Sequence, residues 1–201
     1  MIKPDLYSAF LTPNYMEKTR CGWVPASDQL YADYHDNEWG KLIFDDNVLF
    51  EFLVLESFQA GLSWITILRK RENFRQAFDH FDYQKIAKYD NGKIIDLLQN
   101  EGIIRHRGKI EAAINNAQKF IDIQKEFGSF STYLWSFVNR TPIKNQFHSL
   151  SEVPAKTSLS EQIAKDLKKR GFKFMGATTV YAYMQAVGLV NDHILGCFCI
   201  D

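Results

Sequence analysis

The stretch that decides the fold class is RGKIEAAINNAQKFIDIQKEF, residues 107–127. Its apolar residues recur at steps of three and four, which places them on one stripe of an α-helix, and lysine, glutamate and glutamine fill the opposite side. The pattern therefore predicts a long amphipathic helix. Its stripe consists of Ile110, Ala113, Ile114, Ala117, Phe120 and Ile121.

Helical spacing extends along most of the chain. The pairs Ser27-Asp28 and Asp45-Asp46 and the residue Ser63 are typical of helix N-caps, and each precedes an apolar repeat. Residues 158–170 and 176–187 show the spacing again, whereas strand-like runs at 147–150 and 178–180 are too short to build a sheet. The sequence predicts an all-α fold, with long loops around residues 142–154.

Length and composition limit the classes of protein that this chain can be. It has 201 residues, 46% of them hydrophobic and 24% charged, which excludes intrinsic disorder. Its 24 basic and 24 acidic residues argue against a general polyanion binder but leave local basic patches open. No apolar run is long enough to cross a bilayer, and the first 14 residues do not form a secretory signal, so we expect a cytoplasmic protein. Residues 1–18 are expected to form an N-terminal extension, and residues 19–201 a single compact helical unit.

Four residues from the two ends of the chain form a candidate metal site. Cys21 and His35 lie 14 residues apart, and His193 and Cys197 lie four apart, on one face of a helical turn. Two thiolates and two imidazoles form a tetrahedral set that suits a structural Zn²⁺ with no open position. The alternative is that the cysteines are buried core residues. Cys199 competes for the fourth position, but its spacing from His193 points it away.

An acidic residue and an aromatic cluster form a second candidate site. Glu56 lies in an apolar segment, residues 47–60, so it is either at a rim with its head group in water or buried for a purpose. The aromatic residues form either core or a cage, and a cage beside an acid would suit a flat, cationic ligand. They are Trp23, Tyr31, Tyr34 and Trp39, followed by Trp64 after the Gly61 turn. The apolar repeat of the segment itself is Val48, Phe52, Leu55 and Gln59.

Basic residues gather at three helix junctions. Residues 165–176 carry five basic side chains and one acidic one, with Gly171 and Gly176 bracketing a turn that could aim backbone N–H groups at a phosphate. Residues 105–109 and 69–71 are the other two clusters. Each cluster alone is typical of a solvated face, but three of them in a neutral protein favour one locally basic face.

These segments together resemble the 3-methyladenine DNA glycosylase I family, within the helix-hairpin-helix class of DNA repair enzymes. The resemblance covers roughly residues 20–199. The matching blocks are RCGW (20–23), YHDNEWG (34–40), Glu56 with QAGLSWI (59–65), GIIRHRGKI (102–110), LWSFV (134–138), LKKRGFKF (167–174), MQA (184–186) and GLVNDH (188–193).

The resemblance implies a set of site residues. Glu56 matches the family's active-site acid, and Tyr34 and Trp64 match residues that contact the extruded base, with Trp23, Tyr31 and Trp39 at or behind the pocket. Further implied residues are the zinc ligands Cys21, His35, His193 and Cys197, the apolar wedge Leu62 after Gly61, and the DNA-gripping hairpin with Lys169, Arg170, Gly171 and Lys173. The helix-hairpin-helix itself is expected near residues 158–187. Ser57 and Phe58 depart from the Gly-Gln expected there, a difference that could reshape the pocket edge but should not remove the chemistry.

The resemblance also implies the reaction. The protein is expected to flip an alkylated purine out of double-stranded DNA and hydrolyse its glycosidic bond, releasing free 3-methyladenine. Residues 177–180 contain no lysine where lyase-type relatives place a Schiff-base amine, so a monofunctional enzyme is expected, with Asp192 in a local structural role. We expect a monomer with one structural Zn²⁺, acting at the bacterial nucleoid without a membrane partner. The alternatives are a non-catalytic zinc-stapled DNA-binding module and a zinc hydrolase, which would need an open metal position.

Overall fold

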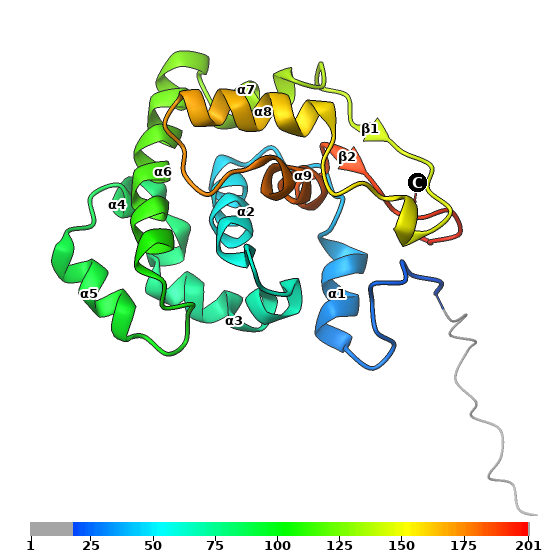
Figure 1. The fold of residues 1–201 in the computed structure, drawn as a ribbon, viewed down its shortest axis with the longest axis horizontal. Coiled ribbons are helices and arrows are strands. Elements are labelled where there is room, and N and C mark those ends of the chain that lie inside the picture. Colours follow the sequence, from blue (N-terminus) through cyan, green and yellow to red (C-terminus); the bar gives the residue numbers. More distant parts are fainter. Residues whose placement is uncertain (1–17, 201) are drawn as a thin grey trace, which may run out of the picture.

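The computed structural model describes residues 18–200, and helices dominate it, which confirms the all-α prediction (Figure 1). The predicted extension lies outside the described residues, apart from its last residue. The α-helices are α1 (Gln29–Asn37), α2 (Asp46–Gln59), α3 (Trp64–Ala77), α4 (Tyr83–Ile86), α5 (Asn91–Gln99), α6 (Arg107–Phe127), α7 (Phe130–Ser136), α8 (Ser158–Lys169) and α9 (Ala177–Ala186). Also present are the 3₁₀ turns η1 (Asp79–Phe81) and η2 (Leu150–Glu152) and the strands β1 (Ile143–Lys144) and β2 (Val190–Asn191).

The helices begin at the residues that local chemistry selects. The Asp28 carboxylate accepts a hydrogen bond from the backbone N–H of Tyr31 at 3.1 Å, and Asp45 accepts from the N–H groups of Asn47 and Val48. Ser63 is the N-cap of α3, although its hydroxyl makes no capping bond. These caps satisfy helix N–H groups that have no partner within the helix, so the predicted starts of α1, α2 and α3 are confirmed.

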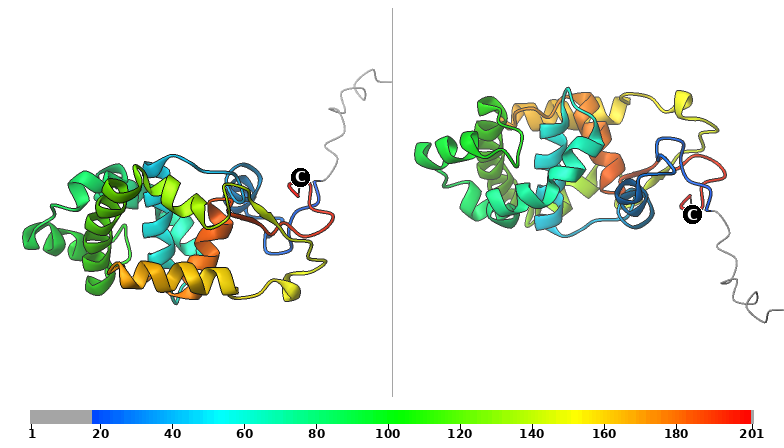
Figure 2. Two further views of the ribbon diagram at one scale, coloured as in Figure 1. Left: turned by 90° about the horizontal axis from the view of Figure 1, so that it is seen from above. Right: turned by 90° about the horizontal axis from the view of Figure 1, so that it is seen from below.

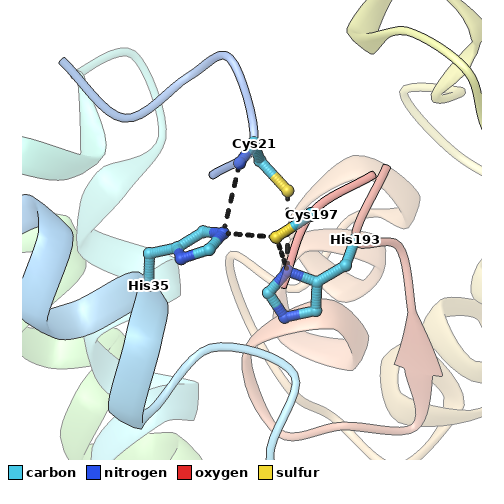
Figure 3. Close-up of side chains that lie close together, drawn as sticks. All are labelled: Cys21, His35, His193 and Cys197. Carbon is cyan, nitrogen blue, oxygen red and sulfur yellow. Dashed lines mark hydrogen bonds between the residues drawn. The ribbon is translucent and has the colours of Figure 1, made fainter. Parts of the chain in front are cut away.

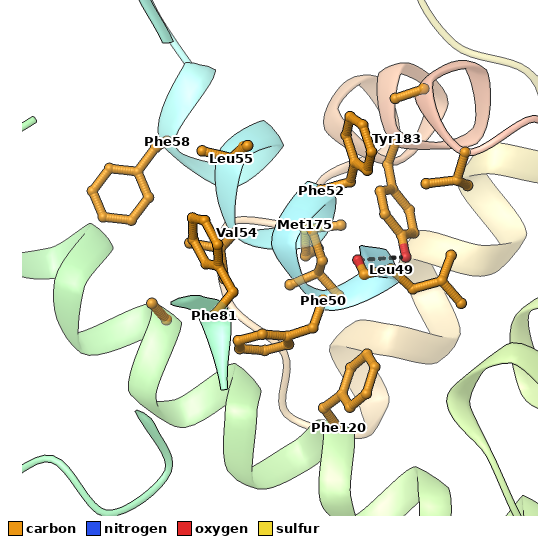
Figure 4. Packing of buried hydrophobic residues seen from close by; sticks show 14 of the residues in the cluster. Leu49, Phe50, Phe52, Val54, Leu55, Phe58, Phe81, Phe120, Met175 and Tyr183 are labelled. Atoms are coloured by element: carbon orange, nitrogen blue, oxygen red, sulfur yellow. Dashed lines mark hydrogen bonds between the residues drawn. The ribbon is translucent and has the colours of Figure 1, made fainter. Parts of the chain in front are cut away.

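Helix α2 runs through the middle of the molecule and is buried on nearly all sides (Figures 1 and 4). It packs against α3, α6, α7 and α9. The expected one-sided repeat is therefore wrong for this helix: Val48 is 36% exposed, whereas Phe50 and Leu53, outside the repeat, are fully buried. A helix that is apolar all round belongs in the core, and this position holds Glu56 inside the molecule.

Helix α6 follows its predicted boundaries and borders the core along one side (Figure 1). Five of the six predicted stripe residues are buried, while Ile121 is only half-buried and the neighbouring Ile123 is buried instead. Its N-cap is His106, whose ring nitrogen accepts from the N–H of Lys109 at 3.2 Å. The buried face of α6 therefore closes one side of the hydrophobic core, and the His106 cap fixes the start of the helix.

Several short elements escaped prediction because distant residues fix them. Helix α7 begins where the Asp46 carboxylate, at the start of α2, accepts from the N–H groups of Phe130 and Ser131 at 2.9 and 2.8 Å. Strand β1, inside the region expected to be loop, pairs in parallel with β2 near the end of the chain, with Ile143 opposite Val190. Each element is shorter than the window in which a periodic pattern can be recognised.

The two ends of the described chain meet at one side of the molecule (Figures 1 and 2). The N–H of Phe198 donates to the carbonyl of Thr19 at 3.0 Å. Cys21, Cys197 and Cys199 form a small buried cluster there, apart from the main hydrophobic core. Of the helices in residues 18–200, none combines the length and hydropathy that a bilayer crossing requires.

Candidate active site and metal centre

An aromatic cavity of about 190 Å³ lies between α1, α2, α3 and α9. One water needs only about 10–15 Å³, so the cavity has room for a small ring system. Its walls include all five predicted aromatic residues and Glu56. The other lining residues are Gln59, Leu150, Val153, Ala182, Gln185 and Asp192.

The aromatic rings around the cavity contact one another in tilted and edge-to-face pairs. Trp23 lies 4.9 Å from Tyr31 and 5.1 Å from Trp39 between ring centroids, and Tyr34 lies 5.3 Å from Trp64. These geometries are the favourable ones for aromatic pairs, so the rings brace each other. A planar ligand that enters this cavity meets aromatic faces supplied by several elements.

Glu56 is buried, which rules out the rim interpretation. The residue is only 4% exposed, and the Oε2 atom of its carboxyl group has no hydrogen-bond partner. Desolvation raises the pKa of Glu56 to about 8. The indole Nε1 of Trp64 is the second buried polar atom without a partner among the described side chains. Because buried polar groups are nearly always paired, two unpaired ones in one cavity indicate a ligand site.

Ser57 and Phe58, which depart from the expected Gly-Gln, lie in the core and not on the cavity wall. Both residues are fully buried, and neither lines the cavity. The Ser57 hydroxyl donates to the carbonyl of Val54 at 2.7 Å, and the Phe58 ring packs 4.9 Å from that of Phe74. The helical turn points both side chains into the core instead.

Two glutamines and an aspartate at the cavity were not among the predicted site residues. Gln59 lies one turn after Glu56 on the same helix face, and Gln185 lies in the MQA block, so both had a sequence signal. Asp192 accepts hydrogen bonds from Tyr181, Gln185 and Asn145. These three donors support the structural role expected for Asp192.

The four predicted metal ligands come together in space (Figure 3). Cys21 precedes α1, His35 lies on α1, and His193 and Cys197 follow β2. All four are buried, and their ligand atoms lie within 4.8 Å of one another. Cys199 stays outside this group: its sulfur lies 3.9 Å from the carbonyl of Asp36.

The spacing of these atoms fits a tetrahedral ion. With Zn–S and Zn–N bonds of about 2.3 and 2.0–2.1 Å, a sulfur and a nitrogen on one Zn²⁺ lie about 3.5 Å apart. The Cys197 sulfur lies 3.4 Å from both His35 Nε2 and His193 Nδ1, and the Cys21 sulfur lies 3.5 Å from His193 Nδ1. The residues therefore fit a metal with a closed S2N2 set.

The surrounding groups hold both imidazoles in the form that a metal needs. The second nitrogen of His35 lies 2.9 Å from Asp36, which is held in turn by Arg20, and that of His193 lies 3.3 Å from the carbonyl of Trp39. Burial lowers the pKa of His193 to about 4, so its ring is neutral at pH 7. Burial also raises the pKa of Cys21 to about 12, so a thiolate there requires a nearby cation.

Comparison with known proteins shows the family of this chain. A family model described as "Methyladenine glycosylase" matches residues 23–200. The chain belongs to the methyladenine glycosylase family. "DNA-3-methyladenine glycosylase 1" of Escherichia coli (strain K12) is 52% identical over 180 residues, which cover 90% of this chain and 96% of the relative. "DNA-3-methyladenine glycosylase" of Haemophilus influenzae is also 52% identical, over 90% of this chain and 97% of its own.

Solved structures agree with this membership. A crystal structure of 3-methyladenine DNA glycosylase I is 53% identical and matches with a TM-score of 0.87 over 90% of this chain and 99% of the other. The enzyme from Staphylococcus aureus, in a structure that concerns its recognition of 3-methyladenine, is 40% identical with a TM-score of 0.86, over 89% and 95% of the two chains.

In this family member, the predicted DNA-contacting residues lie on two turns. Gly61 adopts a φ of +84° between α2 and α3, a conformation that glycine accepts readily, and the following Leu62 is 40% exposed. Gly171 adopts a φ of +93° between α8 and α9. Lys169 and Lys173 are exposed, whereas Arg170 is held in ion pairs with Glu126 and Asp166.

Each of the other two basic clusters places one of its charges in the interior. Arg71 is 8% exposed and pairs with Glu38 and Glu51, which ties α3 to the end of α1 and to α2. Lys109 is 5% exposed and donates to two backbone carbonyls. The predicted basic face depends on the other basic residues of these clusters, and it stays a prediction.

Proposed function

We propose that this member of the methyladenine glycosylase family excises 3-methyladenine from double-stranded DNA, as the first step of base excision repair. The observation that carries the proposal is the unpartnered Glu56 oxygen, buried in a cavity walled by Trp23, Tyr34 and Trp64. An acid in an apolar, aromatic cavity suits a flat cation, and 3-methyladenine is cationic while it is attached to deoxyribose. The relatives carry the name of the same base.

The size of the cavity implies how the base arrives. A volume of about 190 Å³ holds one base and excludes a duplex, so the damaged nucleotide must leave the stack. Extrusion costs a few kcal/mol, and less for a damaged base. Leu62, exposed on the turn between α2 and α3, would fill the gap left in the duplex. Lys169, Gly171 and Lys173 would hold the DNA backbone at the α8–α9 turn, with Arg170 shaping that turn through its ion pairs.

Glu56 would act through its charge rather than as a proton donor. Binding of the cationic base offsets the desolvation cost of the carboxylate, so the pKa of Glu56 falls and the group ionises as the base enters. The bond between the sugar C1′ and N9 then breaks, and its electron pair neutralises the positive charge of the base. Water adds to C1′ and releases a proton, which leaves an abasic sugar and free 3-methyladenine. No lysine lines the cavity in the described chain, which supports hydrolysis without lyase chemistry.

The metal site would hold one structural Zn²⁺ through Cys21, His35, His193 and Cys197. A bound Zn²⁺ would supply cross-linking of the chain ends rather than an open coordination position. The site adjoins the pocket, because Trp39 lines the cavity and its carbonyl contacts His193. A monomer suffices for this function, since one chain supplies every lining residue. The proposed setting is the cytoplasm, at the nucleoid.

Chromatography of released bases tests the proposal. Duplex DNA treated with a methylating agent is incubated with the wild-type protein, with Glu56→Gln and with Glu72→Gln, which alters an exposed carboxylate. We expect free 3-methyladenine from the wild type and from Glu72→Gln, and much less from Glu56→Gln. The DNA should keep its strands intact until alkali cleaves the abasic sites. DNA binding without any base release would instead favour a non-catalytic zinc-stapled binding module. Release that stops immediately on chelation while the fold persists would favour a zinc hydrolase.

A further inference from the structure

Lys109 is a buried cation whose partners are both backbone carbonyls. Its Nζ donates to the carbonyl of Phe58 at 2.8 Å and to that of Ala60 at 2.7 Å. No carboxylate forms an ion pair with it in the described chain, although the residue is only 5% exposed. Burying a lysine charge without an acid is costly, so this arrangement calls for a specific reason.

The two carbonyls belong to the last turn of α2 and its cap. This end of α2 carries unpaired carbonyls and the negative end of the helix dipole, which a cation satisfies well. Directly beyond Ala60 come Gly61 and the exposed Leu62, and Gln59 just before it lines the cavity. Lys109 therefore fixes the point at which the chain leaves the pocket and enters the Leu62 turn.

Two helical turns further along α6, a second buried polar side chain holds the other DNA-facing turn. Asn116 is fully buried, and its amide donates to the carbonyl of Lys173 at 2.9 Å and accepts from the Lys173 N–H at 2.8 Å. Asn115 donates to the carbonyl of Gly171 at 2.8 Å. Seven residues make two turns, so Lys109 and Asn116 share one face of α6, about 10 Å apart along its axis.

We propose that Lys109 is a positioning residue, which together with Asn116 makes α6 the element that fixes the distance between the Leu62 turn and the α8–α9 hairpin. Leu62 can enter the base stack only if it keeps its place while the hairpin holds the backbone. Both residues lie on the single helix α6, so a change in the position of one turn relative to the other would have to break one of these attachments or bend the helix. The inference rests on the DNA contacts given under the proposed function.

The test compares Lys109→Met with Lys125→Met, which removes the same charge from an exposed position on the same helix. Single-turnover excision is measured on 3-methyladenine opposite thymine and opposite an abasic site. For Lys109→Met we expect roughly a 10- to 100-fold loss on the paired substrate, the scale of a misplaced contact. Opposite an abasic site, where extrusion costs less, excision should recover to within about threefold of the wild type. Lys125→Met should match the wild type on both substrates.

Two further measurements separate positioning from other roles of Lys109. Affinity for free 3-methyladenine should not change, since Lys109 does not line the cavity. The salt dependence of DNA binding should keep its slope, whereas loss of a direct phosphate contact would reduce it by about 0.9. A reduced slope would make Lys109 a phosphate ligand and overturn the inference. Equal losses on both DNA substrates and on the free base would reveal general destabilisation and also overturn it.

Comparison of Leu62→Ala, Lys109→Met and the double variant separates the positioning role of Lys109 from the proposed role of Leu62 in the base stack. If Leu62→Ala excises the paired substrate like the wild type, the proposed role of Leu62 fails. If Leu62→Ala is impaired but Lys109→Met is not, the positioning role alone fails. With both singly impaired, we expect the double variant to be little worse than either single one, because both act on one step. Should Lys109→Met not fold, Lys109→Gln, whose amide can still donate, takes its place and should give a smaller loss of the same pattern.

Discussion

The carboxylate of Glu56 and the indole N–H of Trp64 open on one cavity from two successive helices, and neither has a hydrogen-bond partner within the protein. Their helices, α2 and α3, are separated only by the turn that carries Leu62. The groups that would read the base and the group that would replace it in the duplex are thus joined by a few residues of backbone. A shift of the turn would therefore be passed directly to the helices that hold the two groups.

Glu56→Gln should weaken the binding of free 3-methyladenine. The substitution keeps the shape of the side chain but replaces a hydrogen-bond acceptor with an amide donor at the edge of the base, and we expect a loss of about 1–3 kcal/mol, the scale of a charged hydrogen bond. Calorimetry with the free base measures it, with Glu72→Gln as the matched surface control. Excision should fall without vanishing, because the leaving group is labile and stacking on Trp64 persists. Equal affinities for the two variants would remove Glu56 from the site.

The stability of the protein should carry a pH dependence that comes from Glu56. The folded pKa of about 8 lies above the ordinary value of 4.5, so between these values the folded state binds more protons than the unfolded state. The stabilisation relative to the charged form is therefore complete below about pH 4.5 and is lost as the pH rises toward 8. Urea denaturation at pH 5.5 and pH 8 should show a larger decline for the wild type than for Glu56→Gln. The two proteins differ only at residue 56, so parallel declines would contradict the raised pKa of Glu56.

Removal of the metal should unfold the junction of the chain ends before it affects the pocket chemistry. We expect about one Zn²⁺ per chain by elemental analysis, and His35→Ala or Cys197→Ala should lower the melting temperature by roughly 10 °C or more, since about 1 kcal/mol corresponds to about 2–4 °C at this size. The matched control is Cys199→Ser, which changes a neighbouring cysteine outside the four-ligand group and should retain the zinc. A metal-free wild-type protein of unchanged stability would contradict the site.

The lysines of the hairpin should contribute affinity for DNA without sequence preference. Lys169→Ala with Lys173→Ala removes two exposed charges, so binding to undamaged duplex should weaken and its salt slope should fall by about 0.9 for each lost phosphate contact. Lys85→Ala with Lys125→Ala, two exposed lysines elsewhere, is the control. Fluorescence anisotropy over a range of salt concentrations measures both slopes. The same loss of affinity in the control pair would show that the hairpin lysines act only through the overall charge of the protein and make no direct phosphate contacts.

Arg170 should behave differently from these lysines. Its guanidinium bridges Glu126 and Asp166 and lies over the rings of Phe127 and Tyr133. Arg170→Ala should therefore lower the melting temperature, whereas Lys169→Ala alone should not. Thermal unfolding of the two variants checks this expectation. A stable Arg170→Ala that binds DNA poorly would instead make Arg170 a direct DNA contact.

The sequence by itself determined the features that depend on local chemistry. Helix starts at Ser27-Asp28 and at Asp45-Asp46 were predictable because a capping side chain acts within three residues, and α6 was predictable because its stripe repeats over 21 residues. The residue types of Cys21, His35, His193 and Cys197 left a metal site and buried core cysteines both open, and the resemblance made the metal site an expectation. The resemblance predicted that Glu56 and the five aromatic residues share one pocket, and the structure has all six around one cavity.

Only the tertiary structure decided which charged groups lie inside. Glu56 lies in an apolar segment and Lys109 in a basic one, yet Glu56 faces a cavity, and Lys109 binds two backbone carbonyls that are 49 and 51 residues away. Val48 and the strand pair β1–β2 were equally beyond prediction, because their environments depend on neighbours that are distant in the sequence. Burial is set by the packing of all elements around α2, and a linear pattern records only the neighbours within a turn or two.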